Sequence, residues 1–166
     1  MLEHKQYEPL LEVKEVVDML NKISIFAGLN DKQLYKLFRL LETVHYKKNE
    51  TVFEQDTEPS HIYIIHSGAI KLIVSEDDTP YELVVFEQGH CFGESSVIGI
   101  QPHTATAIAT EDTELIVLSR TALMSIYKND IEMFCLLLLN ISREVCRRLH
   151  GSSDTLMLYM KQKAGQ

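Results

Sequence analysis

Small, donor-bearing and acidic residues gather in one stretch of the sequence, residues 89–109 (GHCFGESSVIGIQPHTATAIA). Gly93 has no Cβ, so a ligand or another backbone can approach the chain closely there. Ser95 and Ser96 bring hydroxyl donors, and the N–H groups of such a turn can form an anion-binding concavity. Glu94 only accepts hydrogen bonds when it is ionised, so it suits the hydroxyls of a ligand rather than its phosphate oxygens. Together these groups match the chemistry of a sugar phosphate.

The order of residues in this stretch resembles the phosphate-binding cassette of cyclic-nucleotide-binding domains, as in catabolite-activator-type bacterial regulators and the regulatory subunits of cyclic-AMP-dependent kinase. The family's motif is Phe-Gly-Glu, then a small residue, and nine or ten residues past the Glu an Arg, then Ser, Thr or Ala, then Ala. Here residues 92–94 are Phe-Gly-Glu and residues 104–105 are Thr-Ala, but His103 stands at the place of the Arg. The hairpin over residues 62–71 also resembles the family, and the likeness covers about residues 20–149.

The resemblance implies a ligand-binding site of eight residues: Phe92, Gly93, Glu94, Ser95, Ser96, His103, Thr104 and Ala105. By position, Gly93 and Ser95 would offer backbone donors, Glu94 would accept from the ribose 2′-hydroxyl, and Thr104 would contact the phosphate. The implied ligand is cAMP, cGMP or another small anionic molecule. No catalytic residue, metal ligand or obligatory cofactor is expected.

The replacement of Arg by His103 predicts weakened or altered binding. An Arg offers five donors in a planar fork and is always charged, whereas a His offers at most two divergent donors and is mostly neutral at pH 7. Losing a charge-assisted hydrogen bond to a ligand costs about 2–5 kcal/mol. The leading hypothesis is therefore a stand-alone regulatory module in signal transduction with a weakened ligand site. The alternative is a non-binding dimerisation or scaffold module that keeps only the fold.

Composition and charge exclude several other classes of protein. The formal net charge of −8 disfavours nucleic-acid and anionic-membrane partners. Only 17 residues follow Leu149, too few for a helix-turn-helix, so no DNA binding is expected and the basic residues near the end indicate a solvated helix face. Three scattered cysteines predict neither a disulfide framework nor an iron–sulfur site. The absence of a signal peptide or long apolar run favours a cytoplasmic protein.

Two further alternatives concern metals and enzymes. A metal-dependent enzyme on a related jelly roll would need converging ligands such as a His-x-His pair, and the histidines of this sequence stand singly. His90 and His103 flank the cassette, which leaves a chance metal site as a minor alternative. No nucleophile-elbow, P-loop or dinucleotide-binding motif is present, so catalysis has no support.

The pattern of apolar residues predicts one domain over residues 1–166. Loose polar residues come first, and helices are expected over residues 10–41, with a capping-box start at Asn30 and Gln33. About eight short strands over residues 43–118 are typical of a roll. The predicted fold is mainly β with flanking helices: a double-stranded β-helix, or jelly-roll-like β-roll, with N-terminal helices and a long C-terminal helix.

Helices are expected again over residues 121–149, with a tail over residues 150–166 because a Gly-Ser-Ser-Asp segment interrupts the pattern. The helix over residues 130–149 carries a broad apolar stripe: Ile131, Phe134, Leu138, Ile141, Val145 and Leu149. An apolar surface wider than one face favours a partner helix and hence a homodimer through residues 130–149. The alternative is a helix simply buried against the roll. The sequence does not identify the downstream protein that would receive a signal from this domain.

Overall fold

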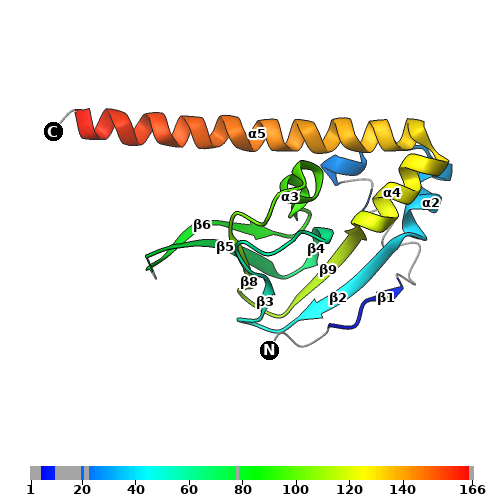
Figure 1. The fold of residues 1–166 in the computed structure, drawn as a ribbon, viewed down its shortest axis with the longest axis horizontal. Coiled ribbons are helices and arrows are strands. Elements are labelled where there is room, and N and C mark those ends of the chain that lie inside the picture. The colour runs from blue at the N-terminus through cyan, green and yellow to red at the C-terminus, as the bar shows by residue number, and fades with distance from the viewer. Residues whose placement is uncertain (1–4, 10–19, 21–22, 78, 165–166) are drawn as a thin grey trace.

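The computed structural model describes residues 5–9, 20, 23–77 and 79–164. Of the helical region predicted over residues 10–41, residues 10–19 and 21–22 lie outside these ranges. The described residues form two facing sheets with helices gathered at one end, and a long C-terminal helix runs across that end (Figure 1).

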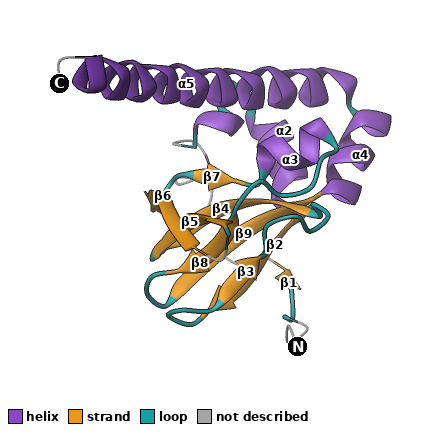
Figure 2. Cartoon of the chain, turned by 60° about the vertical axis from the view of Figure 1, so that its left-hand side comes forward, coloured by secondary structure: helices purple, strands orange, loops and turns teal. Residues whose placement is uncertain are grey.

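The five-stranded sheet has the order β1-β2-β9-β4-β7, and the four-stranded sheet has the order β3-β8-β5-β6. All neighbouring strands pair antiparallel. The strands of the first sheet are β1 (Glu8–Pro9), β2 (Leu41–Tyr46), β9 (Thr113–Ser119), β4 (His61–Ser67) and β7 (Cys91–Phe92). Those of the second are β3 (Thr51–Phe53), β8 (Thr106–Ala109), β5 (Ala69–Glu76) and β6 (Thr79–Glu87). The predicted mainly-β, jelly-roll-like fold with helices is confirmed (Figure 2).

Strand β4 shows why the sheets hold together, because it is buried on both faces. Ile62 and Ile64 belong to the core between the first sheet and the helices, while Tyr63 and Ile65 belong to the core between the two sheets. A strand covered on both faces reads as a continuous apolar run rather than an alternation. The roll is therefore fixed directly to the helical end, which is where the cassette lies.

The sequence does not predict strands β1 and β7, each of which has only two residues. Glu8 pairs with Thr43 of β2, so the expectation that the first residues are loose is wrong for β1. Two residues are too few to show the alternation by which strands are recognised in a sequence.

The helices at the end of the sandwich are the 3-10 helix η1 (Ser24–Phe26), α2 (Asp31–Phe38), α3 (Glu94–Gly99), α4 (Arg120–Asn129) and α5 (Ile131–Ala164). The predicted capping box is confirmed: the Gln33 N–H donates to Asn30 Oδ1 at 3.0 Å, and the Asn30 N–H donates to Gln33 Oε1 at 3.1 Å. None of the described helices is long and apolar enough to cross a membrane.

The predicted break after Leu149 is wrong, since α5 continues without interruption to Ala164. A glycine inside a helix costs only about 1 kcal/mol relative to alanine. Ser153 turns its hydroxyl back onto the helix and donates to the Leu149 carbonyl at 3.0 Å. A single Gly151 with polar neighbours is therefore insufficient to end a helix of 34 residues.

Candidate ligand-binding site

The Phe-Gly-Glu motif lies where β7 turns into α3. Phe92 closes β7 by pairing with Tyr63 of β4, and its ring stacks on the Tyr63 ring with centroids 5.1 Å apart. Gly93 is the N-cap of α3 and has a left-handed backbone, with φ of 79°. A Cβ built at this position would lie 3.1 Å from the His61 carbonyl oxygen and 3.1 Å from the Tyr63 ring. The turn therefore requires glycine for its conformation and for its close approach to β4.

Replacing Gly93 by Ala should lower the free energy of unfolding by about 1–2 kcal/mol, because a left-handed backbone is strained for any residue with a Cβ. The matched control is Gly99→Ala, whose Cβ would have no neighbour nearer than 3.9 Å and whose φ is not left-handed. Urea unfolding followed by circular dichroism measures both. Equal losses for the two variants would contradict this explanation of the turn.

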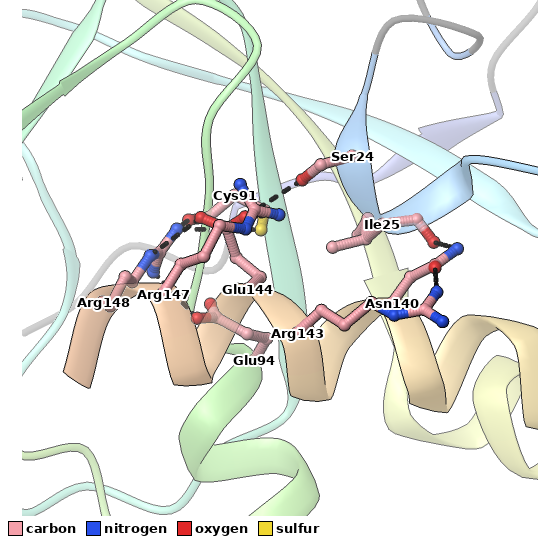
Figure 3. A network of polar contacts seen from close by, with 9 residues as sticks. All are labelled: Ser24, Ile25, Cys91, Glu94, Asn140, Arg143, Glu144, Arg147 and Arg148. Atoms are coloured by element: carbon pink, nitrogen blue, oxygen red, sulfur yellow. Dashed lines mark hydrogen bonds and ion pairs between the residues drawn. The ribbon is translucent and has the colours of Figure 1, made fainter. Parts of the chain in front are cut away.

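Glu94 is the most deeply buried polar residue of the cassette, with 1% of its surface exposed. Its Oε1 accepts from Arg148 NH1 of α5 at 2.8 Å (Figure 3). Its Oε2 has no hydrogen-bond partner among the described residues. Burial raises the pKa of Glu94 and the charge of Arg148 partly offsets the rise. The cassette thus holds one buried carboxylate oxygen that is paired and one that is available to a donor.

Arg148 is held in place from several sides. Its Nε donates to Glu144 Oε1 at 3.2 Å, and its NH2 donates to the Cys91 carbonyl. The guanidinium also lies over the ring of Phe86, 4.7 Å from the centroid. Glu144 is itself buried and accepts from Ser24 at 3.1 Å, so the network joins α5 to η1 and to the cassette (Figure 3).

This network was missed by the sequence analysis, which placed the basic residues near the C-terminus on a solvated face. That expectation is wrong for Arg148, whose side chain is only 28% exposed. The sequence did contain a signal. Glu144 follows Ile141 by three residues and Arg148 follows Glu144 by four, and this spacing places all three on one helix face. Ile141 is buried in the core, so the same face carries Arg148 to the domain.

His103 lies in the second half of the cassette, on the loop before β8. Its ring is 3% exposed and stacks on Phe53, with centroids 3.7 Å apart and ring planes within 9°. The backbone N–H of His103 donates to the Thr57 carbonyl at 2.9 Å, and the backbone N–H of Asp56 donates to the His103 carbonyl at 2.8 Å. Burial lowers the pKa of His103, which favours the neutral ring.

The remaining residues of the predicted site divide between core and surface. Ser96 and Ala105 are buried, whereas Ser95 and Thr104 are exposed. Phe53 connects the two halves, because its ring contacts His103 and also Phe92, with centroids 5.9 Å apart in the second pair. The structure therefore brings the Phe-Gly-Glu turn and His103 around one aromatic cluster.

Possible metal ligands and two cavities lie outside the cassette, within the part of the chain that the structure describes. Among the residues that the structure describes, no group of three or more His, Cys, Asp or Glu side chains could hold a metal ion, so the chance site at His90 and His103 gains no support. A cavity of about 470 Å³ lies beside the ion pair of Lys47 and Asp112. A second, of about 310 Å³, lies beside that of Lys36 and Asp130. In each cavity one lysine of the lining is paired with an aspartate, and neither lining includes a residue of the cassette.

Comparisons with known proteins agree with the fold. The potassium channel AKT6 of Arabidopsis thaliana is 26% identical over 143 residues, covering 86% of this chain and 15% of the channel. A cyclic nucleotide-binding domain from Methylobacillus flagellatus has a TM-score of 0.78 at 20% identity, covering 87% of this chain and 82% of that one. The Thermus thermophilus catabolite activator protein has a TM-score of 0.71 at 24% identity, covering 81% and 62%. Residues 43–130, more than half of the chain, match the cyclic nucleotide-binding domain, and the chain belongs to that family.

Proposed function

We propose that this chain is a regulatory domain of signal transduction whose cassette takes a small anionic nucleotide, cAMP or cGMP or a close relative, with weakened affinity. The observation that carries the proposal is the unpartnered Oε2 of Glu94, buried beside the glycine turn. Buried polar atoms are nearly always hydrogen-bonded, so an unpaired carboxylate oxygen in a turn of this kind calls for a donor. A ribose hydroxyl supplies one.

The weakened affinity follows from His103. Its ring is neutral at pH 7 and is engaged face to face with Phe53, so it brings no fixed positive charge to a cyclic phosphate. The phosphate would then depend on backbone N–H groups of the glycine turn and on the exposed hydroxyls of Ser95 and Thr104. Neutral donors contribute less than a charged guanidinium fork.

Ligand binding would be transmitted through the contact between Glu94 and Arg148. A ribose hydroxyl that donates to Glu94 competes with, or reorders, the ion pair at 2.8 Å that holds α5 to the cassette. A ligand shifts a conformational equilibrium only when it favours one of the two states. In this proposal, the two states differ in how the Glu94 carboxylate is shared between the ligand and α5.

The same helix supports a homodimer through residues 130–149. Ile131, Leu139 and Leu149 lie on α5 and leave 56%, 54% and 65% of their surfaces exposed. The predicted apolar stripe therefore does not pack wholly on the domain: Ile131 and Leu149 of the stripe are exposed, and Ile141 is buried together with Met133 and Leu137. The exposed side chains gain from burial against a second α5.

A non-binding scaffold is the second candidate, and one observation favours it. Arg148 already occupies one oxygen of Glu94, and His103 is packed as a core residue. A domain whose Glu94 is ion-paired within the chain and whose His103 is packed in the core can keep the fold for dimerisation alone. The curated relatives do not decide between the candidates, because the chain spans only about 15% of their length.

Calorimetric titration of the unmodified protein separates the two candidates. The regulatory proposal predicts saturable heat with cAMP or cGMP at one ligand per chain, and none with inorganic phosphate at the same concentration. Adenosine is the matched control ligand, since it keeps the ribose hydroxyls and lacks the phosphate. No saturable heat with any nucleotide would leave the scaffold as the function of the domain.

A further inference from the structure

The outward face of α5 carries a regular stripe of side chains, called here the α5 seam. Its eight members follow one another at alternating steps of four and three residues, and all are exposed: Cys135, Leu139, Ser142, Cys146, Leu149, Ser153, Leu156 and Met160. This is the heptad spacing of a two-stranded coiled coil. No member is charged, although charged side chains occupy other exposed positions of the helix, such as Glu132, Arg147 and Lys161.

The seam is distinct from the face that holds α5 to the domain. Met133, Leu137 and Ile141 are buried in the core on that inner face. The C-terminal part of α5 extends beyond the helical end of the domain (Figure 1). Leu156 and Met160 there leave more than half of their surfaces exposed. An isolated helix is marginal in water, so this part of α5 requires a partner to cover its apolar side.

The spacing and size of the seam favour a second copy of the same chain as that partner. The seam spans residues 135–160, about 39 Å of helix, and a contact strip about 10 Å wide covers roughly 400 Å² of it. Two such strips would bury about 800 Å², the size of a weak, transient protein interface. A heptad stripe is self-complementary across a two-fold axis, whereas an unrelated partner would have to supply a matching stripe.

We propose that two α5 helices pair in parallel and in register, and that Cys135 and Cys146 each face their own counterpart and are joined to it by a reversible disulfide. This inference rests on the proposed α5 dimer. Packed helices have axes about 8–10 Å apart and Cα atoms about 2.3 Å from each axis, which places facing Cα atoms about 3.4–5.4 Å apart, a range whose upper part overlaps that of disulfides. Disulfides bridge Cα separations of about 4.4–6.8 Å.

The chemistry is thiol–disulfide exchange with a small-molecule disulfide such as oxidised glutathione. The thiolate of Cys146 attacks one sulfur, forms a mixed disulfide and releases one glutathione thiolate. The partner's Cys146, as a thiolate, then attacks the protein sulfur of that mixed disulfide and releases the second. Two protein thiols are oxidised and one glutathione disulfide is reduced to two glutathione molecules. Cys91 stays out of this exchange, because it is buried and its pKa is raised to about 12.

The test uses the full chain incubated with oxidised glutathione and analysed on non-reducing gels. The unmodified protein should give a covalent dimer that a reducing agent reverses. Cys135→Ser and Cys146→Ser should each retain a dimer through the remaining cysteine, and the double variant should lose it at least tenfold. Mass spectrometry of peptides should find only links between identical residues.

Several outcomes overturn the proposal. Peptides linking Cys135 to the partner's Cys146 would exclude the in-register parallel pair, and so would cross-linking of the double variant. Sedimentation under reducing conditions separates this failure from that of the dimer itself. A dimer in solution that gives no disulfide overturns only the thiol inference, whereas a monomer overturns the α5 dimer and the inference with it.

A seam variant tests the surface independently of the thiols. Leu149→Asp should shift the sedimenting species to monomer and abolish cross-linking. Met124→Asp is the matched control, because Met124 is an exposed apolar residue of α4 and is not a member of the seam. Equal effects of the two substitutions on cross-linking would overturn the seam.

Discussion

Arg148→Met should lower the free energy of unfolding at pH 7 by about 3 kcal/mol, the largest stability effect expected from a single polar residue of this domain. The substitution keeps most of the side-chain volume and removes the charge. Glu94, whose side chain is 2% exposed, would then be a buried carboxylate without its cation. Removing one partner of a buried ion pair is costly because the other charge remains out of water. Urea unfolding followed by circular dichroism measures the loss.

The adjacent arginine provides the matched control. Arg147 pairs with Glu144 at 2.6 Å, but its side chain is 62% exposed. Arg147→Met should cost less than about 1 kcal/mol, as exposed ion pairs do. Combining Glu94→Gln with Arg148→Met should recover part of the loss, because the buried charge is then absent. If the two arginine variants lose the same stability, the buried pair does not hold α5 to the cassette.

The loss in Arg148→Met should also depend on pH. The folded-state pKa of Glu94 is raised by burial, so its contribution to stability is fully present below the unfolded value of 4.5 and is lost as pH rises through the raised value. Removing Arg148 removes the charge that holds this pKa down. The difference between the variant and the unmodified protein should therefore shrink as the pH is lowered from 7 toward 4.5. A difference that grows on acidification would contradict the role given to Glu94.

His103→Arg should raise the affinity for cAMP or cGMP by tens- to thousands-fold, equivalent to about 2–5 kcal/mol. The backbone of residue 103 is fixed by its hydrogen bonds to Thr57 and Asp56, so the new side chain starts from the same place. A guanidinium is planar, can stack on Phe53 as the imidazole does, and still directs donors toward the cassette. Calorimetric titration at neutral pH measures the gain.

Two controls sharpen this prediction. His103→Lys restores a charge without the planar fork, so it should gain less affinity than His103→Arg. Because burial lowers the pKa of His103, acidifying the unmodified protein from pH 8 to pH 6 should leave its affinity nearly constant. A steep rise in affinity around pH 6.5 would show a protonated His103 acting on the ligand, which the structure does not favour.

Local features of the domain were predictable from the sequence because they depend on neighbouring residues. The capping box of α2 needs only Asn30 and Gln33, and the left-handed backbone of the turn is set at Gly93 itself. The strand pattern between residues 43 and 118 follows from turn residues and apolar runs. These are the parts of the fold in which the sequence-based expectation and the structure agree.

The rest depends on residues that are far apart in the chain. Arg148 and Glu94 are 54 residues apart; the spacing along α5 indicates that Arg148 faces the domain but not that it meets Glu94. The stacking of His103 on Phe53 depends on the pairing of β8 with β3, which a one-dimensional pattern does not show. The contacts that join α5 to the cassette and to η1 belong to this class, whereas the pair of Arg148 and Glu144 is local to α5. The continuation of α5 past Gly151 is a different case. A glycine disfavours the helix by only about 1 kcal/mol, and a rule that ends a helix at every glycine ignores how small this cost is.

The most direct test of the account is a cAMP titration of the isotope-labelled protein followed by NMR at single groups. The account predicts that the amide signals of Gly93, Ser95 and Ser96 and the Nε–H signal of Arg148 move together with one midpoint, at a concentration well above that of the His103→Arg variant. Cassette amides that saturate while the Arg148 signal stays unchanged would contradict the claim that Glu94 couples ligand binding to α5.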